Sequence, residues 1–382
     1  MKVALIHDWL VDFGGAEVVL QNLVEIYPDA DLFTAIDFLG KDERSFLKKT
    51  NITTSWLQKI PFVSKFYRYL MPLMFRVVED FDLTSYDLIV SSSHAVAKNV
   101  IVSPNQLHIC YCHSPMRYAW DMAHEYQSKL KLSRFSIKGY FIKRELAKAR
   151  YMDLASSFRV DYFIANSSYI RKRIMKCYKR DSIVIHPPCP QLVSSQFLEE
   201  QNSLRDYFFT CSRLVSYKNV DLIATTFGEC HPDLKIKIAG DGPDRRIIEK
   251  LSEKYRNVEY LGRVSDEEKT TLMLGAKAFV YAAKEDFGIV PVEAQSCGTP
   301  VVAFGEGGLV DTIMTSSTTH PTGVLYGSQT MASLSEGISR FLNEYDLSWR
   351  ENAQKNSQRF SKESFKKELS NFVNDLVREE RI

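Results

Sequence analysis

Short apolar runs alternate with helix-like segments along the whole chain, in two separate series. Strand-like runs of the first series lie at 2–9, 87–93, 108–114, 161–167 and 182–188. Those of the second lie at 207–212, 234–240, 257–262, 277–283 and 300–305, with helices expected at 218–230, 243–255, 266–275, 289–297 and 308–314. Alternation of this kind favours a parallel sheet covered by helices. The sequence therefore predicts an α/β chain of two doubly wound domains that face a cleft.

The segment HPPCPQLVSSQFLEEQNSLRD (186–206) interrupts this rhythm with prolines and polar residues, which is typical of a linker between domains. We therefore expect an N-terminal domain over residues 1–187 and a C-terminal domain over residues 188–360. The last segment, 361–382, contains an amphipathic helical pattern, SKESFKKELSNFVNDLVREE. We expect this helix to return to the N-terminal domain.

Two glutamates lie eight positions apart in KEDFGIVPVEAQSCGTP (284–300). Gly288 breaks the chain after a predicted strand, and Pro291 suits the first turn of a helix. Glu285 should then lie in the strand-to-helix loop and Glu293 in the first turns of the helix. The two carboxylates therefore do not face each other along one continuous helix.

The backbone N–H groups of residues 287–290 would point outward from the start of this helix. A helix start carries partial positive charge and binds phosphate, and in open α/β sheets ligands bind beyond the carboxyl ends of the strands. Carboxylates beside such an anion site suit the hydroxyls of a sugar and a ribose. In the alternative interpretation, Glu293 only complements the helix dipole and Glu285 is a solvated loop acid.

Two cations precede this segment in CSRLVSYKNVDLI (211–223). Arg213 follows a predicted strand and Lys218 begins a predicted helix, so both side chains can reach one diphosphate. Charge-assisted hydrogen bonds of this kind contribute roughly 1.5–3 kcal/mol each. The alternative is that both are ordinary surface cations.

Glycine-rich turns follow other predicted strands, at GDGP (240–243), LGRVSDEE (261–268) and GEGGLVDT (305–312). Another, GGAE (14–17), follows the first strand. Each glycine permits a positive φ or a close approach of the backbone to a ligand. None of these turns is specific when taken alone.

Taken in order, these motifs resemble the donor-binding half of glycosyltransferase family 4 over residues 207–315. The first half adds GGAE (14–17) and ANSSYIRKRI (165–174), which are similar to the family's first-domain motifs. The resemblance implies the GT-B fold, in which two Rossmann-like domains face a cleft. It also implies a retaining transferase that takes its sugar from a nucleotide diphosphate and needs no metal.

The resemblance implies a role for each matched position. Arg213 and Lys218 would bind the donor diphosphate and stabilise the leaving nucleotide. Glu285 would contact the hydroxyls of the transferred sugar, and Glu293 would accept a hydrogen bond from the nucleotide ribose. The other implied donor-binding positions are Gly14, Gly15, Gly262, Arg263, Val264, Phe287, Gly288, Ile289 and Val290.

His113 follows a predicted strand, in CHSPMRYAWD (112–121), and so belongs at the sheet edge that would face the cleft. Members of the family often place a histidine there, near the sugar or the acceptor, and we expect a catalytic role; the alternative is a structural histidine. The string resembles a subgroup that moves mannose or related sugars onto bacterial lipid-linked or surface glycans. Asp311 departs from the glutamate that the family often has after the last GG, which puts a ligand role there in doubt.

The charge is nearly balanced overall but unevenly spread. A formal net charge of +2 argues against a nucleic-acid partner, whereas residues 129–150 hold eight Lys or Arg and one Glu. Aromatic residues and four cations without an acid are mixed in 56–76. We expect this surface to bind an anionic membrane peripherally; the alternative is a solvated helix face with core aromatics.

The cysteine pattern and the start of the chain bear on metal and compartment. Seven cysteines are scattered, and Cys110-x-Cys112-His113 lacks a second pair at ligand spacing, so no metal site and no cofactor are expected. The start turns polar too early for a signal peptide. We expect a cytoplasmic protein at the inner face of the cell membrane.

The resemblance thus implies a retaining hexosyltransferase, and we expect a mannosyltransferase that uses GDP-mannose and a polyprenyl diphosphate-linked glycan acceptor. A GT-B enzyme of different chemistry, such as a nucleotide-sugar epimerase or a sugar phosphorylase, is the alternative. A dinucleotide-dependent oxidoreductase is disfavoured, because the pair Gly14-Gly15 lacks the G-x-G-x-x-G spacing. A non-catalytic membrane scaffold is a further alternative.

Overall fold

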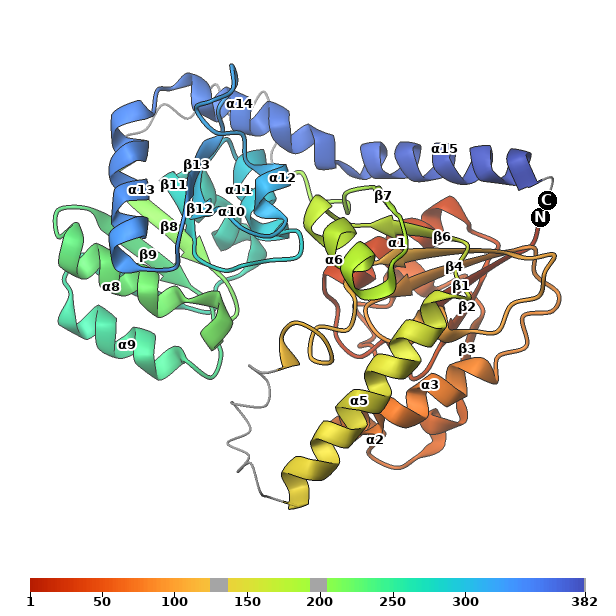
Figure 1. The fold of residues 1–382 in the computed structure, drawn as a ribbon. Helices are drawn as coiled ribbons and strands as arrows, with labels where there is room; N and C mark the ends of the chain where they lie inside the picture. The colour runs from red at the N-terminus through yellow and green to blue at the C-terminus, as the bar shows by residue number, and fades with distance from the viewer. Residues whose placement is uncertain (124–136, 193–204, 381–382) are drawn as a thin grey trace. The chain divides into compact units, whose positions relative to one another are not determined.

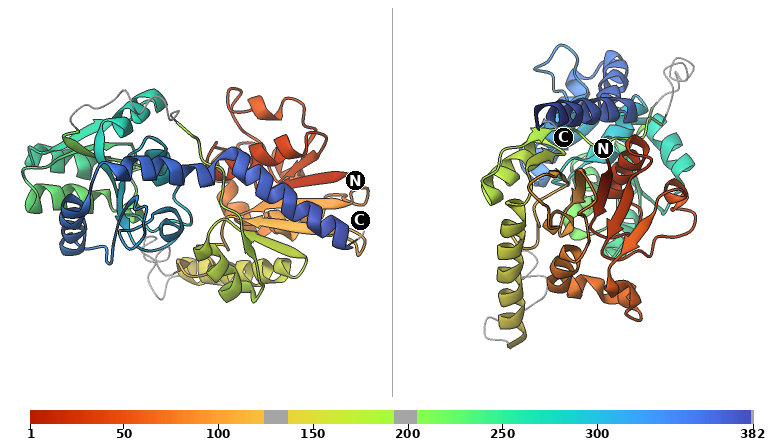
Figure 2. Two further views of the ribbon diagram at one scale, coloured as in Figure 1. Left: turned by 90° about the horizontal axis from the view of Figure 1, so that it is seen from above. Right: turned by 90° about the vertical axis from the view of Figure 1, so that its right-hand side faces the viewer.

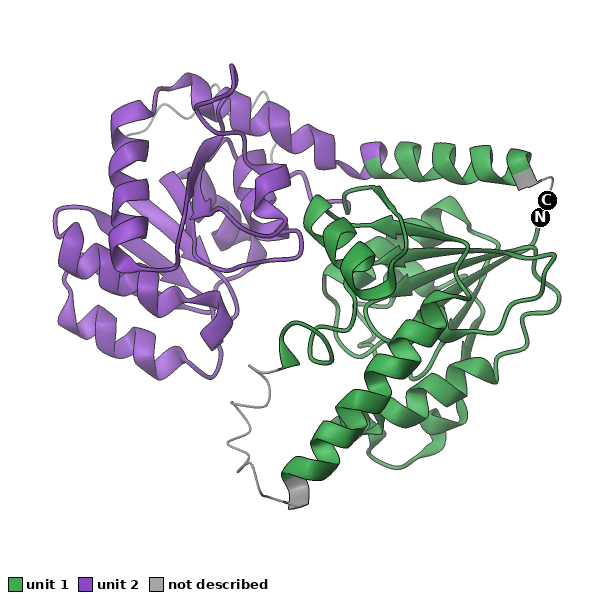
Figure 3. Ribbon diagram, viewed as in Figure 1, with its two compact units in different colours: residues 1–187, 365–382 green, residues 188–364 purple. Residues whose placement is uncertain are grey.

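The computed structural model describes residues 1–123, 137–192 and 205–380. The chain divides into two compact units: residues 1–187 with 365–382, and residues 188–364 (Figure 3). Each unit is built on one parallel sheet, as the alternating pattern predicts.

The sheet of the first unit has seven strands in the order β3-β2-β1-β4-β5-β6-β7, and every pair is parallel (Figure 1). The strands are β1 (Val3–His7), β2 (Asp31–Thr34), β3 (Ile52–Thr54), β4 (Leu88–Ser93), β5 (Leu107–Cys112), β6 (Tyr162–Ala165) and β7 (Ile183–Val184). The helices are α1 (Gly15–Ile26), α2 (Val63–Phe66), α3 (Met71–Glu79), α5 (Ile137–Ser157), α6 (Ser168–Tyr178) and α15 (Lys362–Glu380).

The core of this unit lies on both faces of the sheet, because successive side chains of a strand point to opposite faces. In β1, Ala4 and Ile6 pack against the side that carries α3, whereas Val3 and Leu5 pack against the side that carries α1. Strands buried on both faces read as continuous apolar runs, which is why β1, β4, β5 and β6 could be expected from the sequence. The strands β2 and β3 were not expected.

The helix α15 belongs to the first unit although it follows the second in sequence. Phe365, Leu369, Val373 and Leu376 are buried in the same cluster as α1. Their spacing places them on one stripe of the helix. Figures 1 and 2 show the helix running along this unit, and Lys366 pairs with Glu25 of α1.

The sheet of the second unit has six parallel strands in the order β10-β9-β8-β11-β12-β13. The strands are β8 (Tyr207–Cys211), β9 (Lys235–Ala239), β10 (Val258–Gly262), β11 (Ala276–Tyr281), β12 (Val301–Phe304) and β13 (Gly323–Tyr326). The helices are α8 (Val220–Cys230), α9 (Arg245–Lys254), α10 (Asp266–Leu274), α11 (Ile289–Ser296), α12 (Leu309–Thr312), α13 (Met331–Glu344) and α14 (Ser348–Ser357). Separate apolar clusters cover the two faces of this sheet.

One segment differs from the expectation, and two others lie partly outside the described residues. The helix expected at 308–314 is one short turn, α12, which ends before Ile313 turns extended. Part of the expected linker (193–204) and part of the basic segment (124–136) lie outside the described residues. In the described part of the chain, no helix combines the length and the apolar character needed to cross a membrane.

Candidate functional site

The carboxyl ends of β8, β11 and β12 lie side by side in the second unit, because these strands are parallel neighbours or share a neighbour. Arg213 and Lys218 follow β8, and Glu285 follows β11. A bridge between Glu285 and Gly307 joins the loop after β11 to the loop after β12. The parallel topology therefore brings Lys218 and Glu285 together across 67 residues of sequence.

Lys218, Tyr281 and Glu285 form a closed triad. The Nζ of Lys218 donates to the hydroxyl of Tyr281 at 2.8 Å and is paired with Oε1 of Glu285. The Tyr281 hydroxyl in turn donates to the same Oε1 at 3.1 Å. Lys218 and Glu285 are each 14% exposed, so the pair is largely shielded from water. Burial, reinforced by the Glu285 carboxylate, raises the pKa of Tyr281 well above its usual range.

Tyr281 is a residue that sequence reasoning missed. It lies at the last position of β11, in a run of buried apolar residues, where its aromatic ring reads as core. The available signal was that its hydroxyl ends a parallel strand four residues before Glu285. Buried tyrosine hydroxyls generally find a polar partner.

The start of α11 leaves backbone donors beside this triad. Gly288 is the N-cap residue at φ 94°, and no side chain caps the helix. A Cβ at this position would lie 2.5 Å from Cδ2 of Leu309, so the site needs glycine for both conformation and space. Ile289 and Val290 begin the helix half-buried, whereas Phe287 is buried against Phe360 at 5.5 Å between ring centroids.

Glu293 lies farther along α11 and is paired with a cation that sequence reasoning missed. Lys269 approaches Glu293 at 3.2 Å and Asp266 at 3.1 Å. Burial raises the pKa of Glu293, against the opposing effect of Lys269. Burial lowers the pKa of Lys269, but Glu293 and Asp266 outweigh that effect and raise it. The carboxylate is therefore held by α10 as well as by its own helix.

The remaining expected donor positions of this unit are more open. Arg213 and Arg263 are exposed. Within the described ranges, the Arg213 side chain makes no hydrogen bond or ion pair. Gly262 ends β10 at φ 71°, and Val264 packs half-buried against one of the apolar clusters. Arg213, which comes five residues before Lys218, is thus a cation that no described side chain neutralises.

In the first unit, His113 lies directly after β5 and is half-buried. Its Nε2 lies 2.8 Å from Oγ of Ser92, and the same Oγ lies 3.1 Å from Nδ1 of His7. Nε2 of His7 approaches Oε1 of Glu17 at 3.4 Å. The backbone N–H of Gly14 donates to the other oxygen of Glu17 at 2.9 Å, so the loop at Gly14 and Gly15 is tied to His113.

Asp8 and His94 form an ion pair beside this network, and sequence reasoning missed it. Nδ1 of His94 lies 2.9 Å from Asp8, whose buried carboxylate also accepts backbone N–H groups from His94, Ala95, Val96 and Ala97. Burial opposes the charge of Asp8, but His94 and these N–H groups hold its pKa well below the usual range. The pair could have been suspected from the polar residues that end two apolar runs, in HDW (7–9) and SSSH (91–94).

These charges act on the histidines at the carboxyl edge of the sheet. Burial favours neutral His94, but the Asp8 carboxylate outweighs it and raises the pKa of His94. Burial, together with the cationic character of His94 and His7, lowers the pKa of His113 to about 3. His113 is therefore uncharged near neutral pH, whereas its neighbour His94 favours the cation.

Two residues of the segment after His113 are engaged inside the unit. Trp120 donates its Nε1–H to Asp153 at 2.7 Å, and Asp153 also binds the buried Lys98. Asp121 pairs with Arg173, which comes from the motif ANSSYIRKRI. These contacts hold the segment in place.

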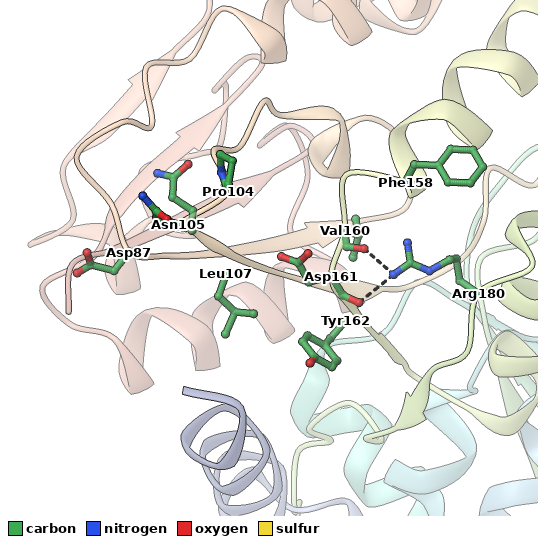
Figure 4. A pocket seen from close by; sticks show the side chains of 10 residues that line it. Asp87, Pro104, Asn105, Leu107, Phe158, Val160, Asp161, Tyr162 and Arg180 are labelled. Carbon is green, nitrogen blue, oxygen red and sulfur yellow. Dashed lines mark hydrogen bonds between the residues drawn. The ribbon is translucent and has the colours of Figure 1, made fainter. Parts of the chain in front are cut away.

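A cavity of about 710 Å³ lies at the opposite edge of the first sheet (Figure 4). Asp87, Leu107 and Asp161 line it and come at the amino ends of β4, β5 and β6. Its guanidinium, Arg180, donates to the carbonyl oxygens of Val160 at 2.7 Å and Asp161 at 2.9 Å. None of the expected site residues lines this cavity.

Part of the chain matches a family model and two curated relatives. Residues 196–360 match the model of the family Glycosyl transferases group 1. The chain is 28% identical over 189 residues to the gpi3 subunit of the phosphatidylinositol N-acetylglucosaminyltransferase of Schizosaccharomyces pombe, covering 47% of this chain and 40% of that one. It is 29% identical over 145 residues to the GDP-mannose-dependent monoacylated alpha-(1-6)-phosphatidylinositol monomannoside mannosyltransferase of Corynebacterium glutamicum, covering 35% and 37%. The matches thus span less than half of each of these two curated relatives.

Solved structures match over nearly the whole chain. HepE of Anabaena, solved in complex with UDP, has a TM-score of 0.69 at 18% identity and covers 98% of this chain and 100% of its own. Sucrose-phosphate synthase of Thermosynechococcus elongatus also has a TM-score of 0.69 at 18% identity, covering 98% and 99%. The chain therefore has the GT-B fold of two Rossmann-like units, and its residues 196–360 match the Glycosyl transferases group 1 model.

Proposed function

We propose that the protein is a glycosyltransferase that transfers a sugar from a nucleotide diphosphate donor. The observation that carries the proposal is the pairing of Lys218 with Glu285 at the carboxyl edge of the second sheet, beside the uncapped start of α11. This edge is where ligands of open α/β sheets bind. The group 1 family match over the same unit and the neighbouring GT-B structures support it.

The triad explains how one site can serve both ends of the donor. Without ligand, Glu285 neutralises Lys218. A diphosphate competes for Lys218 with more negative charge than one carboxylate, and Arg213 and the N–H groups of α11 add to that attraction. Once Lys218 turns to the diphosphate, Glu285 is free to accept hydrogen bonds from sugar hydroxyls.

The chemistry that we propose is transfer with retention at the anomeric carbon. Bond breaking makes the sugar cation-like and the diphosphate more negative, so Arg213, Lys218 and the helix start stabilise the leaving group. The departing phosphate oxygen accepts the proton of the acceptor hydroxyl on the same face. Glu285 and Glu293 then hold hydroxyls, and they do not act as the acid and base of a glycosidase. We expect this chemistry to need no metal.

For the sugar we propose mannose, from GDP-mannose, and for the acceptor a polyprenyl diphosphate-linked or surface-polysaccharide glycan. The Corynebacterium relative, whose name gives GDP-mannose dependence and a phosphatidylinositol monomannoside, supports the donor and a lipid-linked acceptor. So does the resemblance of CHSPMRYAWD to mannose-transferring members of glycosyltransferase family 4.

We further propose that the first unit binds the inner face of an anionic membrane peripherally. Tyr140 and Tyr151 on α5 are exposed, and so is Phe62, which precedes α2. Lys143 and Arg144 are exposed on the same helix as the tyrosines. Aromatic rings with cations suit the interface of anionic lipids, where a lipid-linked acceptor is found.

A donor and acceptor assay tests the proposal. The purified chain is incubated with GDP-mannose, UDP-glucose or UDP-N-acetylglucosamine, with and without a polyprenyl diphosphate-linked glycan, and with and without EDTA. We expect transfer with an α-linked product from GDP-mannose, unchanged by EDTA. Transfer from a UDP-sugar would replace mannose with that sugar, and an isomerised nucleotide sugar would support an epimerase instead. Absence of both turnover and nucleotide diphosphate binding would overturn the proposal.

A further inference from the structure

Four side chains form an unbroken polar chain at the carboxyl edge of the first sheet. Glu17 comes from α1, His7 ends β1, Ser92 lies in β4, and His113 follows β5. The links are 3.4 Å from Glu17 to His7, 3.1 Å from His7 to Ser92, and 2.8 Å from Ser92 to His113. Ser92 is fully buried and His7 is fully buried, so water does not replace these links.

The direction of each hydrogen bond follows from counting protons. A serine hydroxyl has one proton to donate, and a neutral imidazole has one N–H and one bare nitrogen. Ser92 Oγ lies between Nδ1 of His7 and Nε2 of His113 and has no third partner among the described residues, so its one proton goes to one ring and it accepts from the other. The orientation of Ser92 therefore decides which nitrogen of His113 carries the proton.

Consider first His7 in its neutral form. The Glu17 carboxylate can only accept, so Nε2 of His7 carries the proton and Nδ1 of His7 is bare. Ser92 then donates to His7 and accepts the Nε2–H of His113. His113 is left with a bare Nδ1, which accepts a hydrogen bond from a ligand.

Consider next His7 in its protonated form, in which both of its nitrogens donate. Ser92 must now accept from His7 and donate to Nε2 of His113. A neutral His113 then carries its proton on Nδ1, which becomes a donor to a ligand. One proton on His7 thus reverses the hydrogen-bonding character of His113.

We propose that Glu17, His7, Ser92 and His113 are a proton relay that stores one proton on His7 and sets whether Nδ1 of His113 accepts or donates. On acidification, a hydronium ion gives a proton to Nδ1 of His113 and is left as water, and the Nε2 proton of His113 passes to Ser92. The original proton of Ser92 passes to Nδ1 of His7. His7 ends as an imidazolium beside the Glu17 carboxylate, and the charge of the network rises by one.

The surroundings favour His7 over His113 as the place where the proton is stored. The charged and titratable groups that act on His113 are the Asp8–His94 pair, His7 and Glu17, and Arg117 acts on His94. Burial and the two neighbouring histidines lower the pKa of His113 to about 3. Glu17 faces His7, and its own pKa is lowered because His7 and the N–H of Gly14 outweigh the effect of burial.

The relay assigns a ligand chemistry to His113. Within the described residues, Nδ1 of His113 has no hydrogen-bond partner, and the ring is half-buried. With His7 neutral, Nδ1 suits a hydroxyl; with His7 protonated, it suits a phosphate oxygen. Naming that hydroxyl as one of a sugar or glycan acceptor rests on the proposed function, whereas the relay itself does not.

Histidine NMR on the unmodified protein tests the relay without any substrate. The chain is labelled with ¹⁵N-histidine, and the signals of His7 and His113 are assigned with single variants. On acidification we expect His7 to become an imidazolium while His113 stays neutral and changes from the Nε2–H to the Nδ1–H tautomer at the same midpoint. Different midpoints, or His113 becoming the cation, would overturn the relay.

Two variants and a matched control locate the relay. Ser92→Ala removes the link, and His7→Gln removes the storage site; in both we expect the tautomer change of His113 to disappear. Ser91→Ala is the control, because Ser91 points to the opposite face of β4 and bonds His108 at 2.9 Å. A tautomer change that persists in Ser92→Ala, or that also disappears in Ser91→Ala, would contradict the assignment.

Activity separates this inference from the proposed function. If the protein transfers sugars, Ser92→Ala should lower turnover by roughly 10²-fold with unchanged donor binding. The pH dependence of turnover should also lose the change that accompanies protonation of His7 in the unmodified protein. Unchanged turnover and pH profile would overturn a role in the reaction. If the protein shows no transferase activity but the protonation of His7 and the tautomer of His113 still change together, the proposed function is refuted and the relay stands.

Discussion

At the scale of single residues, three charge pairs lie at the carboxyl edges of the two sheets. Lys218 is paired with Glu285, Glu293 with Lys269, and Asp8 with His94. Removing one partner of a shielded pair leaves the other charge free or unpaired. Substitutions at these positions therefore report on the partner as well as on the residue replaced.

We expect Lys218→Ala and Glu285→Gln to separate diphosphate binding from turnover. Lys218→Ala removes a charge-assisted hydrogen bond and should weaken GDP or UDP binding about 10- to 100-fold. Glu285→Gln frees Lys218 from its carboxylate, so diphosphate affinity should be unchanged or higher while turnover falls. Isothermal titration calorimetry and steady-state kinetics measure both quantities. Equal losses of affinity in the two variants would contradict the separate roles.

His108 makes the first unit sensitive to acid. Its ring is fully buried between Ser91 and the carbonyl of Arg159, and burial lowers its pKa to about 4, well below the ordinary value of about 6.5. The unfolded chain therefore binds this proton first as the pH falls. Stability should be lost between about pH 6.5 and pH 4, by about 3 kcal/mol from this residue.

The comparison with His108→Gln isolates that contribution. Urea unfolding is followed at pH 7 and pH 4.5 by tryptophan fluorescence, because Trp9, Trp56 and Trp120 all lie in the first unit. The variant should be less stable at pH 7 but lose less unfolding free energy on acidification. The same pH dependence in both proteins would contradict the prediction, because it would mean that His108 has the same protonation state in the folded and the unfolded chain.

At the scale of elements, parallel strands and short loops do the positioning. The carboxyl ends of β1, β4 and β5 supply His7, Ser92 and His113, and those of β8 and β11 supply the positions around Lys218 and Glu285. Residues that end adjacent parallel strands meet whatever their separation in sequence. The helix α15 acts differently, since it supplies core rather than site residues.

Leu369→Ala tests the contribution of α15 to the first unit. Leu369 is fully buried in the cluster that α1 and the sheet share. Its truncation leaves a cavity and should lower the free energy of unfolding of this unit by about 2–5 kcal/mol. Asn374→Ala, at an exposed position of the same helix, is the control and should change it by less than about 0.5 kcal/mol. Equal effects in urea unfolding would argue that α15 is not part of this core.

At the scale of the whole molecule, the two units differ in what they expose. The first unit carries the most exposed aromatic side chains of the described residues, Tyr69 at 86% and Tyr151 at 75%. It also carries the exposed cations of α5. The second unit carries the Lys218–Glu285 pair that we assign to the donor. This division suits an enzyme whose soluble donor and lipid-linked acceptor bind different units.

Charge reversal tests the membrane surface of the first unit. Lys143→Glu with Arg144→Glu should weaken sedimentation with vesicles of anionic lipid by about 30-fold or more, since each cation near such a surface contributes roughly 1 kcal/mol. Arg246→Glu with Lys250→Glu makes the same charge change at exposed positions of α9 in the second unit and should have little effect. Equal losses would indicate a response to net charge and not to this surface.

The sequence by itself determined the class of fold and the candidate site residues of the second unit. Strands buried on both faces are continuous apolar runs, and Gly288 with Pro291 predicts a helix start after a strand. These signals lie within short segments of sequence, so they can be recognised without knowing which strands are neighbours in the sheet. Arg213, Lys218 and Glu285 could therefore be named from their places after predicted strands.

Only the tertiary structure decided which side chains touch. Tyr281, Lys269 and the Asp8–His94 pair lie in stretches that read as core or as ordinary surface, because pairing depends on strand order and register. The chain from Glu17 to His113 joins residues from three strand ends and one helix. Hydrogen bonds between residues at the ends of parallel strands join positions at irregular separations in the sequence, so no local sequence pattern predicts them.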